Sequence, residues 1–161
     1  MAAQHYDAVV IGAGQAGVPL SQALAGSGRS TALIEREHVG GTCINVGCTP
    51  TKTMVASAKT AYIDRRSAEY GVHNGPVSVD MRQVRGRKRA MVDGFRASNL
   101  RRIEAAEGLD LISGEASFTG PRTLAVRTND GEALEIGADN IFINVGCTPT
   151  KTMVASAKTA Y

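Results

Sequence analysis

Aromatic residues are scarce in this sequence: they make up 4% of its 161 residues, and tryptophan is absent. Its three cysteines are too few for the disulfide framework of a small secreted domain, which favours a cytoplasmic protein whose cysteines act in catalysis or metal binding. No apolar run approaches the roughly 20 residues of a membrane-spanning helix, so no membrane partner is expected. The net charge of +3 is small and gives little reason to expect a nucleic-acid partner.

The basic residues gather in one stretch, which contains Arg82, Arg85, Arg87, Lys88 and Arg89. Single-stranded nucleic acids are bound through aromatic side chains interleaved with such charges, and this stretch has none. Asp80 is a good N-cap for a long helix that ends near Gly108. The basic stretch is therefore interpreted as the solvated face of that helix.

The first 35 residues contain two apolar runs separated by helix-forming sequence. Residues 8–11 and 31–35 are short runs typical of buried strands. Between them a helix should extend to about Ala25, where Gly26 and Gly28 end it. A strand, a helix and a second strand in this order predict a parallel sheet and an α/β fold.

The remainder of the sequence predicts two more helices and several short strands. An irregular helix should run from about residue 40 to residue 62, distorted near Pro50, and pack one face on the domain. The long helix after Asp80 has a partial apolar face, formed by Met81, Val84, Met91, Val92, Phe95 and Ile103. Short strands should follow at residues 109–112, 123–127, 133–136 and 141–143, with a turn at Asn129-Asp130-Gly131. They predict a small antiparallel insertion in a three-layer α/β domain.

Gly12, Gly14 and Gly17 have the spacing of a dinucleotide-binding loop and lie between the first expected strand and helix. In such loops one glycine permits the turn, one lets the backbone approach a pyrophosphate, and one lets helix and strand pack closely. The helix N-terminus then offers free N–H groups and a positive dipole end to the phosphates. Glu35 ends the second strand, where a carboxylate can bind the two hydroxyls of an adenosine ribose. The alternative is a glycine-rich turn in an unrelated fold.

Cys43 and Cys48 lie five residues apart at the start of the irregular helix. If that helix is distorted, the two cysteines can form a disulfide, and the helix N-terminus favours the reactive thiolate. Zinc binding is the competing hypothesis, but it needs two more ligands, and the histidines show no ligand spacing. Two inert core cysteines are the remaining alternative. A redox pair is favoured, and no metal site is expected.

Residues 40–52 read Gly-Gly-Thr-Cys-Ile-Asn-Val-Gly-Cys-Thr-Pro-Thr-Lys. This stretch resembles the redox-active signature of the flavin-dependent pyridine nucleotide–disulfide oxidoreductases, which include glutathione reductase, dihydrolipoamide dehydrogenase and mercuric reductase. The Thr-Pro-Thr-Lys ending is most similar to mercuric reductase-like members. With the first strand-helix-strand unit, the resemblance covers residues 6 to about 144. It implies a Rossmann-like FAD-binding domain.

The resemblance also implies a role for each matching residue. The ADP half of FAD would be held by Gly12, Gly14, Gly17 and Glu35, the phosphates would contact Thr42, and the backbone of Gly114 and Ala116 would meet the adenine. Cys43 would attack a disulfide substrate, and Cys48 would be the thiol nearest the flavin. Lys52 would lie beside the flavin N5 and tune its electronics.

The activity that the resemblance implies is electron transfer from NAD(P)H through FAD to the Cys43–Cys48 disulfide, and then to a disulfide or metal-ion acceptor. Members of the family are much longer than this chain and are homodimers. They carry a second glycine motif for NAD(P)H and a C-terminal domain that supplies an acid/base pair to the partner subunit. We therefore expect NAD(P)H to serve only a full-length parent. The alternatives are an inactive FAD-binding fragment and a flavoenzyme of the same fold that uses no disulfide.

Residues 44–62 and 143–161 are the same 19 residues. Structural repeats diverge and need several copies to build a core, so two identical copies indicate a recent duplication or an assembly join. We therefore divide the chain into a partial FAD-binding domain, residues 1–144, and a copied tail, residues 145–161. Residues 150–161 are expected to form a loosely attached helix, and Cys147 is a copy of Cys48 that could capture Cys43.

Overall fold

The computed structural model describes residues 4–146 of the chain. In chain order its elements are β1 (Gln4–Ile11), α1 (Gly17–Gly26), β2 (Thr31–Glu35), α2 (Gly41–Asn45), α3 (Cys48–Arg65), the 3₁₀ helix η1 (Ser67–Tyr70), α4 (Met81–Glu104), β3 (Leu109–Gly120), β4 (Thr123–Thr128) and β5 (Ala133–Ile143). The expectations for Cys147 and for residues 150–161 lie outside the described residues.

The parallel sheet has β1 at its centre. β1 pairs in parallel with β2 on one side and with β5 on the other, and β2 pairs in parallel with β3. Ala8, Val9 and Val10 of β1 are at most 1% exposed, as expected for a strand that is covered on both faces. The expected α/β fold with a parallel sheet is confirmed.

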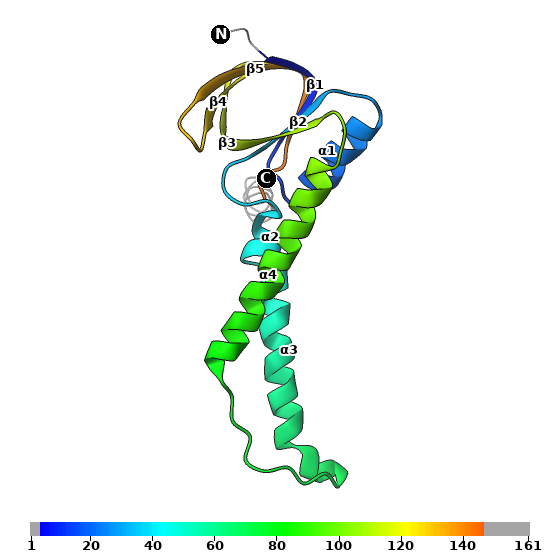
Figure 1. Ribbon diagram of the computed structural model, residues 1–161, viewed down its shortest axis with the longest axis vertical. Coiled ribbons are helices and arrows are strands. Elements are labelled where there is room, and N and C mark those ends of the chain that lie inside the picture. The colour runs from blue at the N-terminus through cyan, green and yellow to red at the C-terminus, as the bar shows by residue number, and fades with distance from the viewer. Residues whose placement is uncertain (1–3, 147–161) are drawn as a thin grey trace, which may run out of the picture.

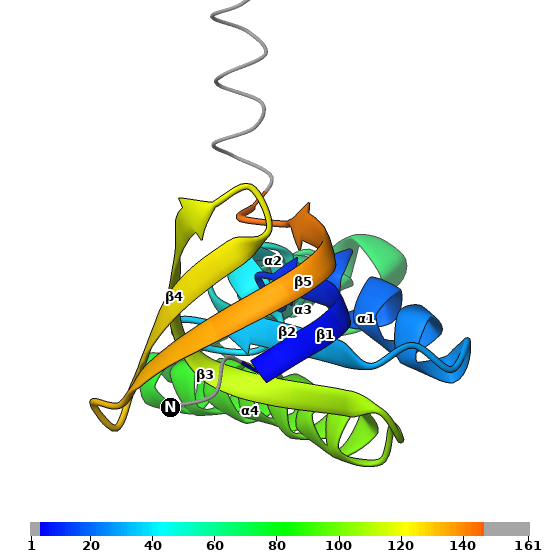
Figure 2. The same ribbon diagram turned by 90° about the horizontal axis from the view of Figure 1, so that it is seen from above.

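The antiparallel part is continuous with the parallel sheet. β3 pairs with β2 through residues 109–113 and then with β4 through residues 114–120. β5 likewise pairs first with β4 and then with β1, so that the five strands close into a barrel (Figure 2). The expectation of separate short strands at 133–136 and 141–143 is wrong, because one strand spans both. The expected turn at residues 129–131 does join β4 to β5.

Two apolar cores lie on opposite faces of the parallel sheet. Leu33 packs with residues of α1 and α4 in one core, and its neighbour Ile34 packs inside the barrel against β4 in the other. Successive side chains of a strand point to opposite faces, which is why adjacent residues of β2 serve different cores. Both are at most 1% exposed, and each such burial contributes about 1.5–3 kcal/mol. Helices, sheet and antiparallel ribbon form the three expected layers.

Helices α3 and α4 project from this body as a long pair (Figure 1). Asp80 caps α4, as expected, because its Oδ1 accepts hydrogen bonds from the amides of Arg82 and Gln83 at 2.8 and 3.2 Å. Arg82, Arg85 and Arg89 are exposed, as expected for a solvated basic face, whereas Lys88 is half-buried and Arg87 donates to the carbonyl oxygen of Thr53 on α3 at 2.9 Å. No helix among residues 4–146 is long and apolar enough to cross a membrane.

The apolar faces expected for these two helices are largely uncovered. On α4, Val92 and Ile103 are buried, but Met81, Met91 and Phe95 are 41–52% exposed. On α3 only Pro50 and Thr53 are buried, so the expectation that residues 50–62 pack a face on the domain is wrong. The reason is geometric: the sheet body lies at one end of the pair, so among the described residues the sheet does not cover the parts of α3 and α4 that point away from it (Figure 1).

Candidate functional site

The glycine loop between β1 and α1 leaves no room for a side chain at Gly12 or Gly17. A Cβ on Gly17 would lie 1.9 Å from the carbonyl oxygen of Gly12, and Gly12 itself has a φ of +98°. The loop therefore turns sharply out of β1 and directly into α1, the geometry that the motif predicts. No side chain among the described residues caps the N-terminus of α1. The amides of Val18 and Leu20 donate to the carbonyl oxygens of Gly14 and Ala16, and Pro19 has no N–H. The uncapped turn before them, residues 14–17, is therefore where a pyrophosphate would fit.

A second glycine loop meets the first. The amide of Gly40 donates to the carbonyl oxygen of Ala13 at 2.7 Å. A Cβ on Gly41 would lie 2.8 Å from the Cα of Gly14, so the two backbones are in contact. Thr42 follows as an exposed residue of the short helix α2. The structure therefore brings Gly14 and Thr42, two of the expected phosphate contacts, to one edge of the parallel sheet.

Glu35 ends β2 beside the first glycine loop. Its Oε2 accepts a hydrogen bond from the amide of Ala13 at 2.8 Å, and its Oε1 accepts one from the amide of Glu37 at 2.9 Å. Each carboxylate oxygen has two lone pairs, so both oxygens keep an acceptor site for a ribose hydroxyl. The carboxylate is half-buried and fixed by the backbone, which suits a binding residue.

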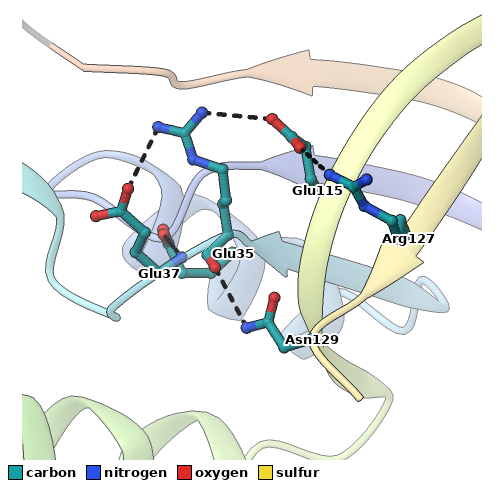
Figure 3. Close-up of polar contacts among 6 residues, drawn as sticks. Glu35, Glu37, Glu115, Arg127 and Asn129 are labelled. Carbon is teal, nitrogen blue, oxygen red and sulfur yellow. Dashed lines mark hydrogen bonds and ion pairs between the residues drawn. The ribbon is translucent and has the colours of Figure 1, made fainter. Parts of the chain in front are cut away.

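A chain of exposed ion pairs runs beside Glu35 (Figure 3). Glu115 of β3 lies between two guanidinium groups, at 3.5 Å from Arg36 and 3.0 Å from Arg127. Asn129 donates to the backbone carbonyl of Arg36 at 3.2 Å, which ties the β4–β5 turn to the end of β2. Exposed pairs of this kind contribute at most about 1 kcal/mol each. Together with the Asn129 hydrogen bond, these ion pairs hold the segment after Glu35 against the barrel.

The structure places Gly114 and Ala116 on β3, one and three residues past the partner of Glu35 in the sheet register. A Cβ on Gly114 would lie 2.6 Å from the carbonyl oxygen of Arg127. Glycine is therefore required there for β3 and β4 to pair, whether or not a ligand is bound. The Ala116 side chain packs against the barrel core. Adenine contacts at these two positions remain an expectation that concerns their backbone.

The two cysteines of the signature are brought together by a break between helices. The single irregular helix that the sequence predicts is two helices, α2 and α3, separated by Val46 and Gly47. A Cβ on Gly47 would lie 2.9 Å from the carbonyl oxygen of Thr42, so the chain folds back on itself at this glycine. Cys48 then begins α3, close enough to Cys43 for hydrogen bonding between the two side chains to raise the pKa of the Cys43 thiol. Both are free thiols in this structure.

The electrostatic surroundings of the pair are uneven. The hydrogen bond with Cys48 and burial raise the pKa of the Cys43 thiol, and the nearby positive charge of Lys52 opposes that shift. Cys48 is the first residue of an 18-residue helix. Lys52 is exposed one turn further along α3. Among the described residues, no group of three or more His, Cys, Asp and Glu side chains gathers as a metal site.

Comparison with known proteins agrees with this geometry. The family model described as pyridine nucleotide-disulphide oxidoreductase matches residues 6–161. The chain belongs to this family. Within the pyridine nucleotide-disulphide oxidoreductases, it is 34% identical over 149 residues to the dihydrolipoyl dehydrogenase of Chlorobaculum tepidum, covering 91% of this chain and 31% of that protein. It is 30% identical over 146 residues to the mercuric reductase of Streptomyces lividans, covering 90% of this chain and 31% of that protein.

A solved structure of the same family is also similar. The Cu(II) complex of the HOCl-induced flavoprotein disulfide reductase RclA from Escherichia coli matches with a TM-score of 0.74 and 36% identity. The match covers 91% of this chain and 29% of that one. This chain thus spans about a third of the length of these oxidoreductases.

Three site residues were not found from the sequence. Asn45, Asn144 and Arg96 hydrogen bond to the two glycine loops or to each other. The signal available in the sequence was the repeat itself, because Asn45 and Asn144 occupy the same position in the two copies.

Proposed function

We propose that this chain is the FAD-binding part of a flavoprotein disulfide reductase. The observation that carries the proposal is the contact between its two motifs: the dinucleotide loop at Gly14 touches the loop at Gly41, which leads directly into the thiol pair. A cofactor whose pyrophosphate lies on the glycine loops would extend along α2 toward Cys48. Membership of the oxidoreductase family supports the same interpretation.

In the proposed site, Gly12, Gly14 and Gly17 leave room for the pyrophosphate, and the uncapped N-terminus of α1 lies next to it. Thr42 adds a hydroxyl on the same edge, and Glu35 accepts hydrogen bonds from the adenosine ribose. Gly114 and Ala116 offer backbone groups to the adenine. FAD, when bound, would supply two-electron chemistry next to the thiol pair.

The thiols have separate roles in the proposal. Cys43 is assigned as the nucleophile toward a disulfide substrate, the role that the resemblance to this family implies for the first cysteine of the signature. Cys48, the first residue of α3, is the thiol that faces the flavin. Lys52 lies one turn along the same helix and adjusts the charge around both groups.

The full reaction is proposed only for a longer parent protein. Electrons would pass from NAD(P)H through FAD to the disulfide and then to a small-molecule disulfide, a dithiol substrate or a metal ion. The parent is proposed to be a cytoplasmic homodimer, without membrane or nucleic-acid partners. A second candidate for the 161 residues themselves is an FAD-binding fragment without turnover, which their share of about 30% of the relatives' length favours.

Reconstitution with FAD followed by spectroscopy tests the proposal. The purified chain should become yellow and retain flavin through gel filtration. On reduction with dithionite and gentle reoxidation, a thiolate beside the flavin should add a long-wavelength charge-transfer band. Cys48→Ser should abolish that band, while Cys43→Ser should preserve it. A yellow protein that lacks the band in every state would indicate a flavoenzyme that does not use the disulfide, and a colourless one would refute FAD binding.

A further inference from the structure

Asn45 and Asn144 are the second residues of the two identical 19-residue copies. Their side-chain amides make the same kind of contact at different places. Each amide nitrogen donates to main-chain carbonyls of a glycine loop: Asn45 to the loop that contains Gly41, and Asn144 to the loop that contains Gly12. The repeated sequence thus supplies one backbone-holding asparagine to each half of the proposed pyrophosphate site.

Asn144 lies against all three motif glycines. Its backbone amide donates to the carbonyl oxygen of Ile11 at 2.7 Å, and its side-chain Nδ2 donates to that of Gly12 at 3.2 Å. A Cβ would lie 3.1 Å from Nδ2 if it were built on Gly14, and 2.8 Å if it were built on Gly17. The asparagine amide therefore fills the space behind the turn, and it leaves the exposed side of the loop free for a ligand.

Asn45 holds the second loop. Its Nδ2 lies within hydrogen-bond distance of three carbonyl oxygens, those of Gly41 at 2.8 Å and of His38 and Val39 at 3.3 Å each. Its Oδ1 accepts a hydrogen bond from Nε of Arg96 on α4. Because a guanidinium can only donate, this bond fixes the amide with its nitrogen toward the loop. Asn45 therefore links the cysteine segment, the second glycine loop and α4.

We propose that Asn45 and Asn144 are positioning residues for the dinucleotide, and that they hold the two glycine loops in the relative arrangement that receives a pyrophosphate. The inference rests on the proposed FAD site. The two loops touch at Gly14 and Gly41 and share the hydrogen bond from Gly40 to Ala13. Neither asparagine needs to contact the ligand, since each acts through the backbone that it holds.

Asn140 provides a matched control for Asn144. It lies four residues earlier in the chain, on β5, and its Nδ2 also donates to a main-chain oxygen, that of Asp7 at 3.4 Å. Asn144→Ala should weaken FAD binding about tenfold, since it leaves the carbonyl of Gly12 without this donor. Asn140→Ala should change FAD affinity less than about twofold, because its bond lies away from the glycine loops. Asn45→Ala should weaken FAD binding to a similar extent as Asn144→Ala. Its control is Asn74→Ala, in the loop between η1 and α4.

Hydrogen exchange of the apo chain tests the inference without FAD. In Asn144→Ala, the amides of residues 12–18 should exchange roughly tenfold faster than in the wild type. In Asn45→Ala, the amides of residues 38–42 should show the same increase. In each case the loop loses a hydrogen bond that restrains it. Neither change should occur in Asn140→Ala or Asn74→Ala. Unchanged exchange in these loops would overturn the proposed positioning role, whatever the outcome of the FAD titration.

Asn144→Asp separates positioning from a general loss of folding, because it preserves the size of the side chain. The ionised carboxylate cannot donate to Gly12, and it adds a negative charge behind the pyrophosphate loop. FAD affinity should therefore fall further than in Asn144→Ala, and the difference between the two variants should shrink as salt is raised.

Equal, salt-independent losses in Asn144→Asp, Asn144→Ala and the Asn140→Ala control would contradict the inference. Failure of the wild type to bind FAD would instead refute the proposed function, and the exchange measurement would still decide the inference.

Discussion

The backbone of Gly47 lies so close to Cys43 that a Cβ on Gly47 would stand 3.2 Å from the Cα of Cys43. The same Cβ would stand 2.9 Å from the carbonyl oxygen of Thr42. Gly47→Ala must therefore move the start of α3 away from α2, at a cost of about 1–3 kcal/mol for overpacking. Because the displacement carries Cys48 away from Cys43, closing the Cys43–Cys48 disulfide must reverse it, and the disulfide should become easier to reduce, by at most roughly 150-fold in its equilibrium with glutathione, the whole of that cost expressed as a ratio. Mass spectrometry of samples quenched in glutathione buffers measures this ratio.

Gly75→Ala is the control for this substitution. A Cβ on Gly75 meets nothing within 4 Å, so the thiol–disulfide equilibrium should not change. If Gly47→Ala left the equilibrium as it is in the Gly75→Ala control, the fold-back at Gly47 would not be what brings the thiols together.

The carboxylate of Glu35 is predicted to hold the adenosine ribose. Glu35→Ala should weaken FAD binding by about 1.5–3 kcal/mol, the range for hydrogen bonds to a charged group. Part of that loss would come from the amide of Ala13, which donates to Glu35 in the folded chain. Isothermal titration of the apo protein with FAD gives the affinity directly.

Glu37→Ala serves as the comparison, because Glu37 is an exposed neighbour whose carboxylate pairs with Arg36 at the surface. It should leave FAD affinity within about twofold of the wild type, as expected for a surface pair. Equal effects of the two substitutions would show that Glu35 acts through general charge and not through the ribose.

The sequence predicted those parts of the fold that depend on local pattern. β2 spans residues 31–35 as expected, since a run of buried residues bounded by turns has few alternatives. Asp80 was found as an N-cap because capping depends only on the residue and the helix that follows it. The motif glycines were found because the contacts that exclude a side chain there follow directly from the turn between a strand and a helix.

The rest depended on contacts between distant segments. β3 and β5 were each predicted as shorter strands because they change partner half-way, and nothing in a strand's own pattern records that change. The partial apolar face of α4 was predicted, but its exposure was not, because it depends on how far the helix extends beyond the sheet that could cover it. The roles of Asn45 and Asn144 could not be predicted either, because each amide meets a loop whose position is set by the packing of the parallel sheet.

The purified 161-residue chain is predicted to have no steady-state NAD(P)H-dependent disulfide reductase activity. It spans about 30% of the length of related oxidoreductases, and its one dinucleotide loop is assigned to FAD. Without a second nucleotide site, a hydride donor has no position from which to deliver electrons. The loss of NADPH or NADH absorbance in the presence of a disulfide acceptor measures turnover. Dithionite is the control, since it should reduce bound flavin directly, and sustained NAD(P)H consumption above the buffer blank would contradict the prediction.

The Cys43 thiol should be slow to alkylate at neutral pH, and Cys48 should be the cause. The hydrogen bond with Cys48 is the largest contribution that raises the pKa of Cys43, followed by burial. A raised pKa in the folded state means that folding favours the thiol form. The associated stability is fully present below the ordinary thiol pKa and is lost as the pH rises through the higher, folded value. Alkylation requires the thiolate, so its rate reports the same shift.

In Cys48→Ala the hydrogen bond is gone, the pKa of Cys43 should fall, and Cys43 should react several-fold faster with iodoacetamide near neutral pH. Cys48→Ser keeps a hydroxyl that can hydrogen bond with Cys43 and should leave Cys43 slow. Peptide mass spectrometry across a pH series distinguishes Cys43 from the other cysteines, and equal rates in the alanine and serine variants would show that the bond between the two side chains does not control the reactivity of Cys43.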